Sequence, residues 1–250
     1  MEHSNKQHLV RKGIYILPNL FTTASLFTGF MAIIWAADGY FEWSAMAIFF
    51  SALMDGLDGK VARLTGTASE FGVQYDSLAD LAAFGVAPGF LVYAWMINVY
   101  GRVGAAVAFL FATCGALRLA RFNVAASSGA SKKFFIGLPI PAAGCTIAAL
   151  VFFVPHLPDF LEVVIPGFCI ILTGVLGILM VSRVRYYSFK EYGFLQTHRY
   201  RSMVTAILIF SLVMSHPRLF GFLLFFVYII IGLVYTFVLL PKKTPLPFTQ

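Results

Sequence analysis

The stretch "MDGLDGKVARLTGTASEFGVQYDSLAD", residues 54–80, decides how this chain is organised. It contains Asp55, Asp58, Asp76 and Asp80, and the sequence on both sides of it is strongly apolar. Acidic side chains are expensive inside a membrane, so those found there usually face a polar cavity and have a partner. Four of them within one short stretch therefore predict a functional site.

The composition is that of a membrane protein. Of the 250 residues, 60% are hydrophobic and 12% are charged, whereas a soluble domain usually carries about 25% charged residues. The first 13 residues are polar, and the apolar run that follows is longer than that of a signal peptide, so no cleavable signal sequence is expected. The net charge of +7 indicates membrane topology and contact with anionic lipids rather than nucleic-acid binding.

Apolar runs long enough to cross a bilayer predict an all-α, polytopic membrane protein with about eight transmembrane helices. The predicted helices are 14–37, 41–64, 72–98, 102–124, 138–155, 161–182, 202–216 and 218–240. We expect three parts in the chain: a cytoplasmic amino-terminal segment, a six-helix core, and a loop with two additional helices and a tail. Their ranges are 1–13, 14–185 and 186–250.

The distribution of basic residues predicts which loops lie on the cytoplasmic side of the membrane. With the amino terminus inside, the inner loops hold all of the 18 lysines and arginines except Arg102 and Arg218. Such a bias supports eight spans with both termini in the cytoplasm. The cysteines are far apart within apolar runs and are predicted to be buried thiols without a metal-binding motif. They are Cys114, Cys145 and Cys169.

The spacing of the aspartates places them on two opposed helix faces. Asp55 and Asp58 are i, i+3, and Asp76 and Asp80 are i, i+4, so each pair shares one face of a helix. Counting outward from the turn "TGTASEFG" at about 1.5 Å per residue sets Asp58 opposite Asp76 and Asp55 opposite Asp80. The prediction is two stacked carboxylate pairs across one interhelical gap.

Four carboxylates in one gap need cations. Lys60 and Arg63 are the basic residues of this stretch and balance only two of the four charges. Oxygen ligands without His or Cys favour a hard divalent ion such as Mg²⁺, Mn²⁺ or Ca²⁺, and two ions are possible. Small residues in the same stretch allow either close helix packing or access of a large ligand to the backbone. They are Gly56, Gly59, Ala62 and Gly72.

The pattern Asp-x-x-Asp-Gly-x-x-Ala-Arg, eight residues, Gly-x-x-x-Asp-x-x-x-Asp resembles the signature of the CDP-alcohol phosphotransferase family at every fixed position. These positions are Asp55, Asp58, Gly59, Ala62, Arg63, Gly72, Asp76 and Asp80. The resemblance covers the first six predicted helices and leaves the last two as an addition. Three further stretches look like bacterial integral-membrane phosphatidylserine synthases: "LPNLFTTASLFTGF" (17–30), "RLARFNV" (118–124) and "FIGLPIPAA" (135–143).

The resemblance implies transfer of the phosphatidyl group from CDP-diacylglycerol to the hydroxyl of L-serine, giving phosphatidylserine and CMP with Mg²⁺ or Mn²⁺. It implies that Asp55, Asp58 and Asp76 bind metal, and that Asp80 both binds metal and accepts the proton of the acceptor hydroxyl. The implied contacts to CDP and its diphosphate are Asn19, Thr22, Gly59, Arg63, Ser69 and Gly72. Read alone, Asn19 and Thr22 also fit a helix start with a local hydrogen bond, and Arg63 fits a membrane anchor.

The acceptor site is predicted at the segment that joins the fourth and fifth helices. Arg118 and Arg121 lie three residues apart on one helix face, and either could bind a carboxylate or a lipid phosphate. Asn123 and Lys132 would complete this pocket. Anchoring of the chain on the inner leaflet is the alternative role for these basic residues.

Three other functions are considered. The first is the same chemistry with glycerol 3-phosphate, an inositol phosphate or a choline-type alcohol as acceptor. The second is an ion transporter, for which we would expect sites near the midplane and often an internal repeat. The third, a purely structural protein, leaves the acids without a role. The resemblance further implies a homodimer in the bacterial cytoplasmic membrane, with its active site on the cytoplasmic side and no nucleic-acid partner.

Overall fold

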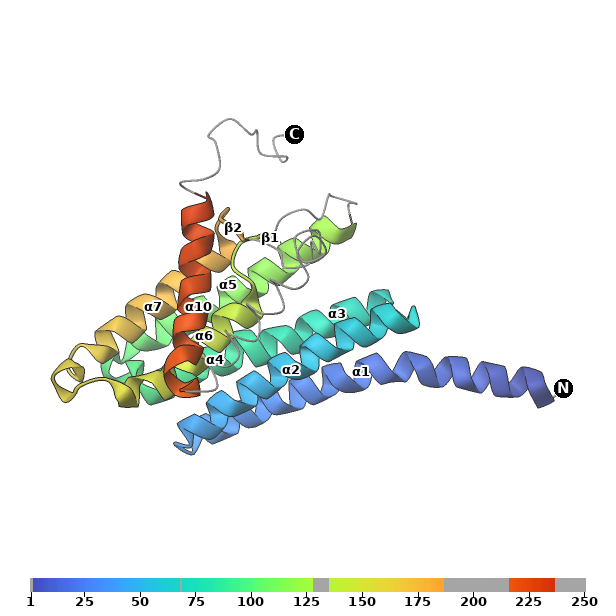
Figure 1. Ribbon diagram of the computed structural model, residues 1–250, viewed down its shortest axis with the longest axis horizontal. Helices are drawn as coiled ribbons and strands as arrows, with labels where there is room; N and C mark the ends of the chain where they lie inside the picture. Colours follow the sequence, from blue (N-terminus) through green and yellow to red (C-terminus); the bar gives the residue numbers. More distant parts are fainter. Residues whose placement is uncertain (1, 68, 128–134, 187–215, 237–250) are drawn as a thin grey trace.

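A computed structural model describes residues 2–67, 69–127, 135–186 and 216–236 (Figure 1). The helices are α1 (Glu2–Ala37), α2 (Phe41–Thr65), α3 (Glu70–Asp80), α4 (Ala87–Trp95), α5 (Arg102–Ser127), α6 (Ile140–Phe153), α7 (Ile165–Val181) and α10 (Pro217–Val234). A π-helical segment, η1 (Leu81–Val86), joins α3 to α4. Short 3₁₀ turns are η2 (Ile97–Tyr100), η3 (Val154–His156) and η4 (Asp159–Leu161). The predicted all-α class is therefore confirmed.

One pair of very short strands is the exception to the helical architecture. β1 (Phe135–Ile136) pairs antiparallel with β2 (Arg185–Tyr186). The main chain continues the pairing, because the Gly137 N–H donates to the Val184 carbonyl at 2.8 Å. This pairing joins the segment before α6 to the segment after α7.

The predicted helices correspond to observed ones, except that 202–216 lies outside the described residues apart from His216. The helix predicted over 14–37 begins earlier than expected, since α1 is one helix from Glu2 and its amino-terminal part projects beyond the other helices (Figure 1). α7 begins at Ile165 rather than at 161, because Pro166 stands in its first turn, where proline is favoured.

Several helices are apolar enough to cross a membrane. Those of sufficient length are Pro18–Ala37, Glu70–Trp95 and Arg102–Ala125, and shorter apolar helices are Ile140–His156, Ile165–Val181 and Arg218–Val234. α2 has 25 residues but carries the charges of the aspartate stretch in its second half. The expected number of eight spans stays a prediction.

Hydroxyl side chains join α1 to α2, which pack along each other. The buried Ser25 Oγ donates to the Ser51 carbonyl at 3.2 Å, and the Thr28 and Ser51 hydroxyls lie 2.6 Å apart. Nearer the α1–α2 turn, Ser44 Oγ donates to the Ala32 carbonyl at 2.7 Å. Interhelical hydrogen bonds of this kind hold helices together where the surroundings offer no water.

The π-helical segment η1 begins directly after Asp80, and two glycines let other helices approach it closely. A Cβ atom on Gly29 of α1 would lie 2.7 Å from the Ala83 Cα, and one on Gly144 of α6 would lie 2.9 Å from the Phe84 carbonyl oxygen. Both distances are too short for a real Cβ contact. The backbone that carries Asp80 is thus held between α1 and α6 by contacts that require glycine.

Substitution Gly29→Ala should therefore lower the thermal unfolding midpoint of the purified protein in detergent by several degrees. Overpacking of this kind typically destabilises by about 1–3 kcal/mol. Gly221→Ala in α10 is the matched control, because no atom lies within 4 Å of its added Cβ, and it should leave the midpoint close to wild type. A wild-type midpoint for Gly29→Ala would contradict this packing.

Candidate active site

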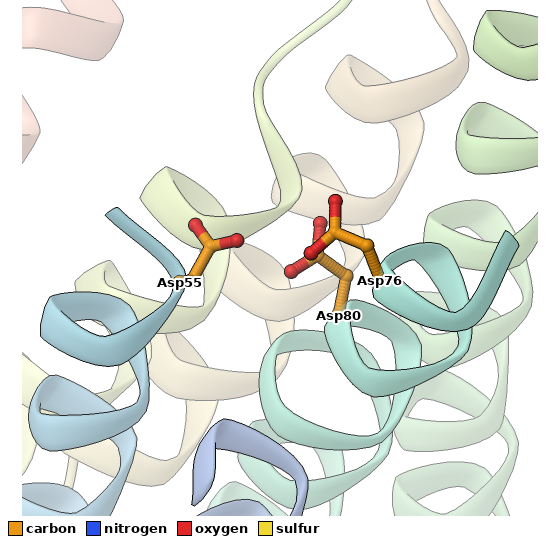
Figure 2. A group of neighbouring side chains, drawn as sticks. All are labelled: Asp55, Asp76 and Asp80. Carbon is orange, nitrogen blue, oxygen red and sulfur yellow. The ribbon is translucent and has the colours of Figure 1, made fainter. Parts of the chain in front are cut away.

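Three of the four aspartates converge in the space between α2 and α3. Asp55 on α2 and Asp76 and Asp80 on α3 each offer a carboxylate oxygen, and these atoms lie within 4.8 Å of one another. Figure 2 shows the three carboxyl groups pointing toward one another across the gap between the two helices. All three side chains are half-buried. We call Asp55, Asp76 and Asp80 the aspartate triad.

Asp58 is not one of the three carboxylates grouped within 4.8 Å, although it is close enough for its charge to act on Asp76 and Asp80. It is buried, at 5% exposure, and its Oδ2 accepts a hydrogen bond from Thr22 Oγ1 of α1 at 2.8 Å. The spacing predicted two stacked pairs, Asp55 with Asp80 and Asp58 with Asp76. The Asp55 and Asp80 carboxyls are in hydrogen-bonding contact, whereas Asp76 joins that pair to form a group of three. Counting residues from the turn predicts how far along its helix each aspartate lies, but it does not predict the direction in which each side chain points.

The chemistry of the triad fits a divalent cation. Carboxylates so close together repel one another unless a proton or a cation lies between them. The group offers oxygen donors only, which suit hard ions such as Mg²⁺ and Mn²⁺ rather than zinc or copper. The residues present therefore fit a metal site in which Asp55, Asp76 and Asp80 would be the ligands nearest to one another.

Local sequence explains why α2 and α3 meet at this point. α2 ends at Gly66, which has φ 64° and donates its backbone N–H to the Ala62 carbonyl; a left-handed residue at this place is a common helix terminus, and glycine adopts it at no steric cost. α3 begins with Ser69 as its cap, whose Oγ accepts the Gly72 N–H at 3.0 Å. The two caps define a short connection that turns the aspartate faces toward each other.

Residues expected at the CDP site form two groups of neighbours, one at the start of α3 and one near the end of α2. A Cβ on Gly72 would lie 3.2 Å from Ser69 Oγ and 3.7 Å from Asn19 Oδ1, so these three residues of α1 and α3 are neighbours. A Cβ on Gly59 would lie 3.4 Å from the Arg63 guanidinium, which is exposed. The arrangement leaves the start of α3 and the end of α2 open to a ligand.

The glycines of the motif do not make close backbone contacts with other helices. Gly56 has no atom within 4 Å of an added Cβ, and Gly59 and Gly72 meet only side chains there. Close backbone approaches occur at glycines outside the motif, among them Gly29 and Gly144. Of the two roles that the sequence left open, this geometry favours access of a ligand.

Two of the residues predicted for the acceptor site, Arg121 and Asn123, make hydrogen bonds to neighbouring helices. Arg121 Nη1 donates to the Val181 carbonyl at 3.0 Å, and its Nη2 reaches the Ser182 carbonyl at 3.5 Å, so this guanidinium caps the end of α7. Asn123 Nδ2 lies 3.0 Å from Ser77 Oγ and 3.2 Å from Gln74 Oε1, which ties α5 to α3. The sequence did not single out Gln74 or Ser77, although their i, i+3 spacing puts them on one face of α3.

Arg118 is the member of this group that remains available to a ligand. It is buried, with 8% exposure, and its Nε has no hydrogen-bond partner among the described residues. The Asp80 carboxyl and the Tyr228 phenol of α10 lie near enough to interact with its charge. Lys132 lies outside the described residues. The three cysteines are free and buried, as predicted.

Comparison with known proteins settles the family. Residues 15–181 match the protein family described as "CDP-alcohol phosphatidyltransferase". The chain belongs to this family.

Curated relatives extend the match. A CDP-diacylglycerol–serine O-phosphatidyltransferase of Helicobacter pylori (strain 26695) is 44% identical over 179 residues, which are 71% of this chain and 74% of that protein. A protein of the same name from Methanocaldococcus jannaschii is 35% identical over 186 residues, 71% of this chain and 76% of that protein. An archaetidylserine synthase of Methanothermobacter thermautotrophicus is 36% identical over 172 residues, 68% of this chain and 69% of that protein.

Membership of the CDP-alcohol phosphatidyltransferase family fits the placement of the triad on α2 and α3, since both helices lie inside the matched range. α10 lies beyond it. Proteins of the family are generally dependent on divalent metal and membrane-bound, which agrees with the aspartate triad and the apolar helices. The predicted division at residues 13 and 185 stays a prediction.

The contacts of Arg121 predict a structural effect of its loss. Arg121→Ala should lower the thermal midpoint in detergent by several degrees, because two carbonyl groups at the end of α7 lose a charged donor, a change worth about 1–3 kcal/mol. Arg102→Ala, at the exposed start of α5, is the control and should leave the midpoint unchanged. If Arg121→Ala were as stable as wild type and only bound substrate more weakly, this capping role would be wrong.

Proposed function

We propose that this protein is a CDP-diacylglycerol–serine O-phosphatidyltransferase, which transfers the phosphatidyl group of CDP-diacylglycerol to L-serine and releases CMP. The observation that carries the proposal is the aspartate triad, at signature positions, in a chain 44% identical to a protein of that name. The names of the relatives above share serine as the alcohol. The family alone would also allow glycerol 3-phosphate, an inositol phosphate or a choline-type alcohol.

The donor would bind at the open ends of α2 and α3. We infer that Asp55, Asp58, Asp76 and Asp80 hold one or two Mg²⁺ or Mn²⁺ ions, which would neutralise charge on the diphosphate when bound. The start of α3 supports this location, because free N–H groups at a helix amino terminus favour phosphate. The proposed contacts to CDP and its diphosphate are Asn19, Gly59, Arg63, Ser69 and Gly72.

The reaction proposed is a direct displacement in a ternary complex. The serine hydroxyl oxygen forms a bond to the phosphorus that carries diacylglycerol, and the bond from that phosphorus to the oxygen of CMP breaks. Asp80 takes the hydroxyl proton as attack proceeds, and CMP leaves with the electron pair of the broken bond. Asp80 suits this role because it is the deeper of the two α3 aspartates and contacts Asp55.

Serine differs from simple alcohols in its carboxylate, and Arg118 is the group proposed to bind it. A buried guanidinium near Asp80, whose Nε has no hydrogen-bond partner in the described part of the chain, can donate to a carboxylate while the hydroxyl of the same molecule reaches the aspartate. Arg121 and Asn123 hold the surrounding helices instead. Arg118→Ala should therefore raise the KM for serine more than the KM for CDP-diacylglycerol.

The setting proposed for this reaction is the bacterial cytoplasmic membrane. The distribution of basic residues supports cytoplasmic termini and a cytoplasmic active site, where serine and cytidine nucleotides are available. A homodimer, common in the family, is proposed on resemblance alone. Cross-linking of the protein in native membranes would show a band at twice the monomer mass.

An acceptor screen tests the proposed function. Purified protein with CDP-diacylglycerol and Mg²⁺ or Mn²⁺ should release CMP when L-serine is added, and EDTA should abolish the release. Serine binding through its carboxylate predicts that ethanolamine, which has the hydroxyl but no carboxylate, is a poor acceptor. CMP release with glycerol 3-phosphate or an inositol phosphate, and none with serine, would reject serine as the substrate.

The same screen separates enzyme from transporter. Asp80→Asn should lose nearly all serine-dependent CMP release, because the amide can neither accept the proton nor serve as an anionic ligand. Asp38→Asn, in the exposed α1–α2 turn, is a charge-matched control and should keep the wild-type rate. A wild-type rate for Asp80→Asn would refute its role as base, and ion flux into vesicles without any CMP release would favour a transporter.

A further inference from the structure

The hydrogen bond between Thr22 and Asp58 joins α1 to the aspartate stretch. Thr22 Oγ1 lies 2.8 Å from Asp58 Oδ2 and 3.2 Å from the Pro18 carbonyl oxygen. Thr22 is 4% exposed and Asp58 is 5% exposed, so water competes poorly for either group. A hydroxyl has one proton to donate, and the closer, charged acceptor is the stronger partner.

This contact differs from the other hydroxyl contacts between α1 and α2. Ser25, Thr28 and Ser44 bond to carbonyl oxygens or to the Ser51 hydroxyl, all of them neutral groups. Among the described side-chain contacts between these two helices, Thr22 is the hydroxyl that reaches a carboxylate. Helix packing alone would be served equally well by another neutral pair.

The bond also fixes where the Asp58 carboxylate lies relative to the aspartate triad. Asp58 is one helical turn from Asp55, yet it stands outside the group of oxygen atoms within 4.8 Å. The Gly59 N–H and the charge of Arg63 act on the same carboxylate from α2 itself. Thr22 is thus the partner that comes from a second helix and sets its orientation across the α1–α2 interface.

We propose that Thr22 is a positioning residue for Asp58, and that it acts on cation binding rather than by contacting the nucleotide. The inference rests on the proposed function, which makes Asp58 a metal ligand by its signature position. A hydroxyl that orients a ligating carboxylate fixes its geometry, and loss of such a partner typically weakens metal affinity 10–100-fold. Family resemblance had placed Thr22 at the cytidine end of the donor.

The test measures Mn²⁺ binding to purified variants of Thr22 by electron paramagnetic resonance, in the absence of substrates. Thr22→Val, which keeps the shape and removes the hydroxyl, should weaken Mn²⁺ binding about tenfold or more. Thr22→Ser should stay near wild type. Thr28→Val removes the hydroxyl that faces Ser51 at the same helix interface, and it should bind Mn²⁺ normally even if its thermal midpoint falls.

Two further measurements make the outcome decisive. In the Asp58→Asn background, adding Thr22→Val should weaken Mn²⁺ binding no further, since the partner is already altered. Should Thr22→Val fail to fold, Thr22→Ala gives the same comparison with a smaller side chain. Unchanged Mn²⁺ binding in folded Thr22→Val or Thr22→Ala, with a raised KM for CDP-diacylglycerol, would overturn the proposal. Failure of the proposed function would appear instead in the wild-type acceptor screen, which does not depend on Thr22.

Discussion

The mutual repulsion of closely spaced carboxylates is the constraint on which this structure depends. Two like charges about 4 Å apart repel by about 4 kcal/mol at an effective dielectric constant of about 20. Asp55, Asp76 and Asp80 approach within 4.8 Å in an apolar protein, so the triad is favourable only when a proton or a cation offsets the repulsion. The triad therefore fits a cation site, and the fold must hold its carboxylates close together against their repulsion.

Contacts made by residues outside the signature hold the aspartates in place. The α1–α2 hydroxyl contacts fix the helix that carries Asp55 and Asp58, and the glycine contacts at η1 fix the backbone that follows Asp80. A π-helical segment directly after a site residue is common at functional sites, because it rotates the side chains on its two sides relative to each other. Asn123 and Arg121 then tie α5 to α3 and to α7.

Much of this could be predicted from the sequence, because hydrophobic periods and helix-terminating residues are local signals. Helix order, the α2–α3 turn and the facing of Asp55 and Asp80 follow from spacing alone. The grouping of Asp76 with that pair, and the separation of Asp58, depend on side-chain rotation and on α1, which are not local. For the same reason Arg118 and Arg121 look equivalent in "RLARFNV", although Arg121 caps α7 and Arg118 is buried with an Nε that no described residue contacts by a hydrogen bond.

The proposed donor and acceptor sites lie on different helices. The proposed donor site depends on residues of α2 and α3, which carry the signature. The proposed acceptor contact depends on Arg118 of α5 and on what surrounds it, including Tyr228 of α10 beyond the matched range. On this proposal, a different alcohol would require changes in α5 and its neighbours while the aspartates stay in place.

Anomalous diffraction from crystals grown with Mn²⁺ shows whether the triad binds a cation. We expect anomalous density between Asp55, Asp76 and Asp80, and none in crystals of Asp76→Asn grown in the same way. A crystal saturated with Mn²⁺ that has no such density at the triad, or that has a lysine or arginine side chain neutralising the triad, would rule out a cation site there.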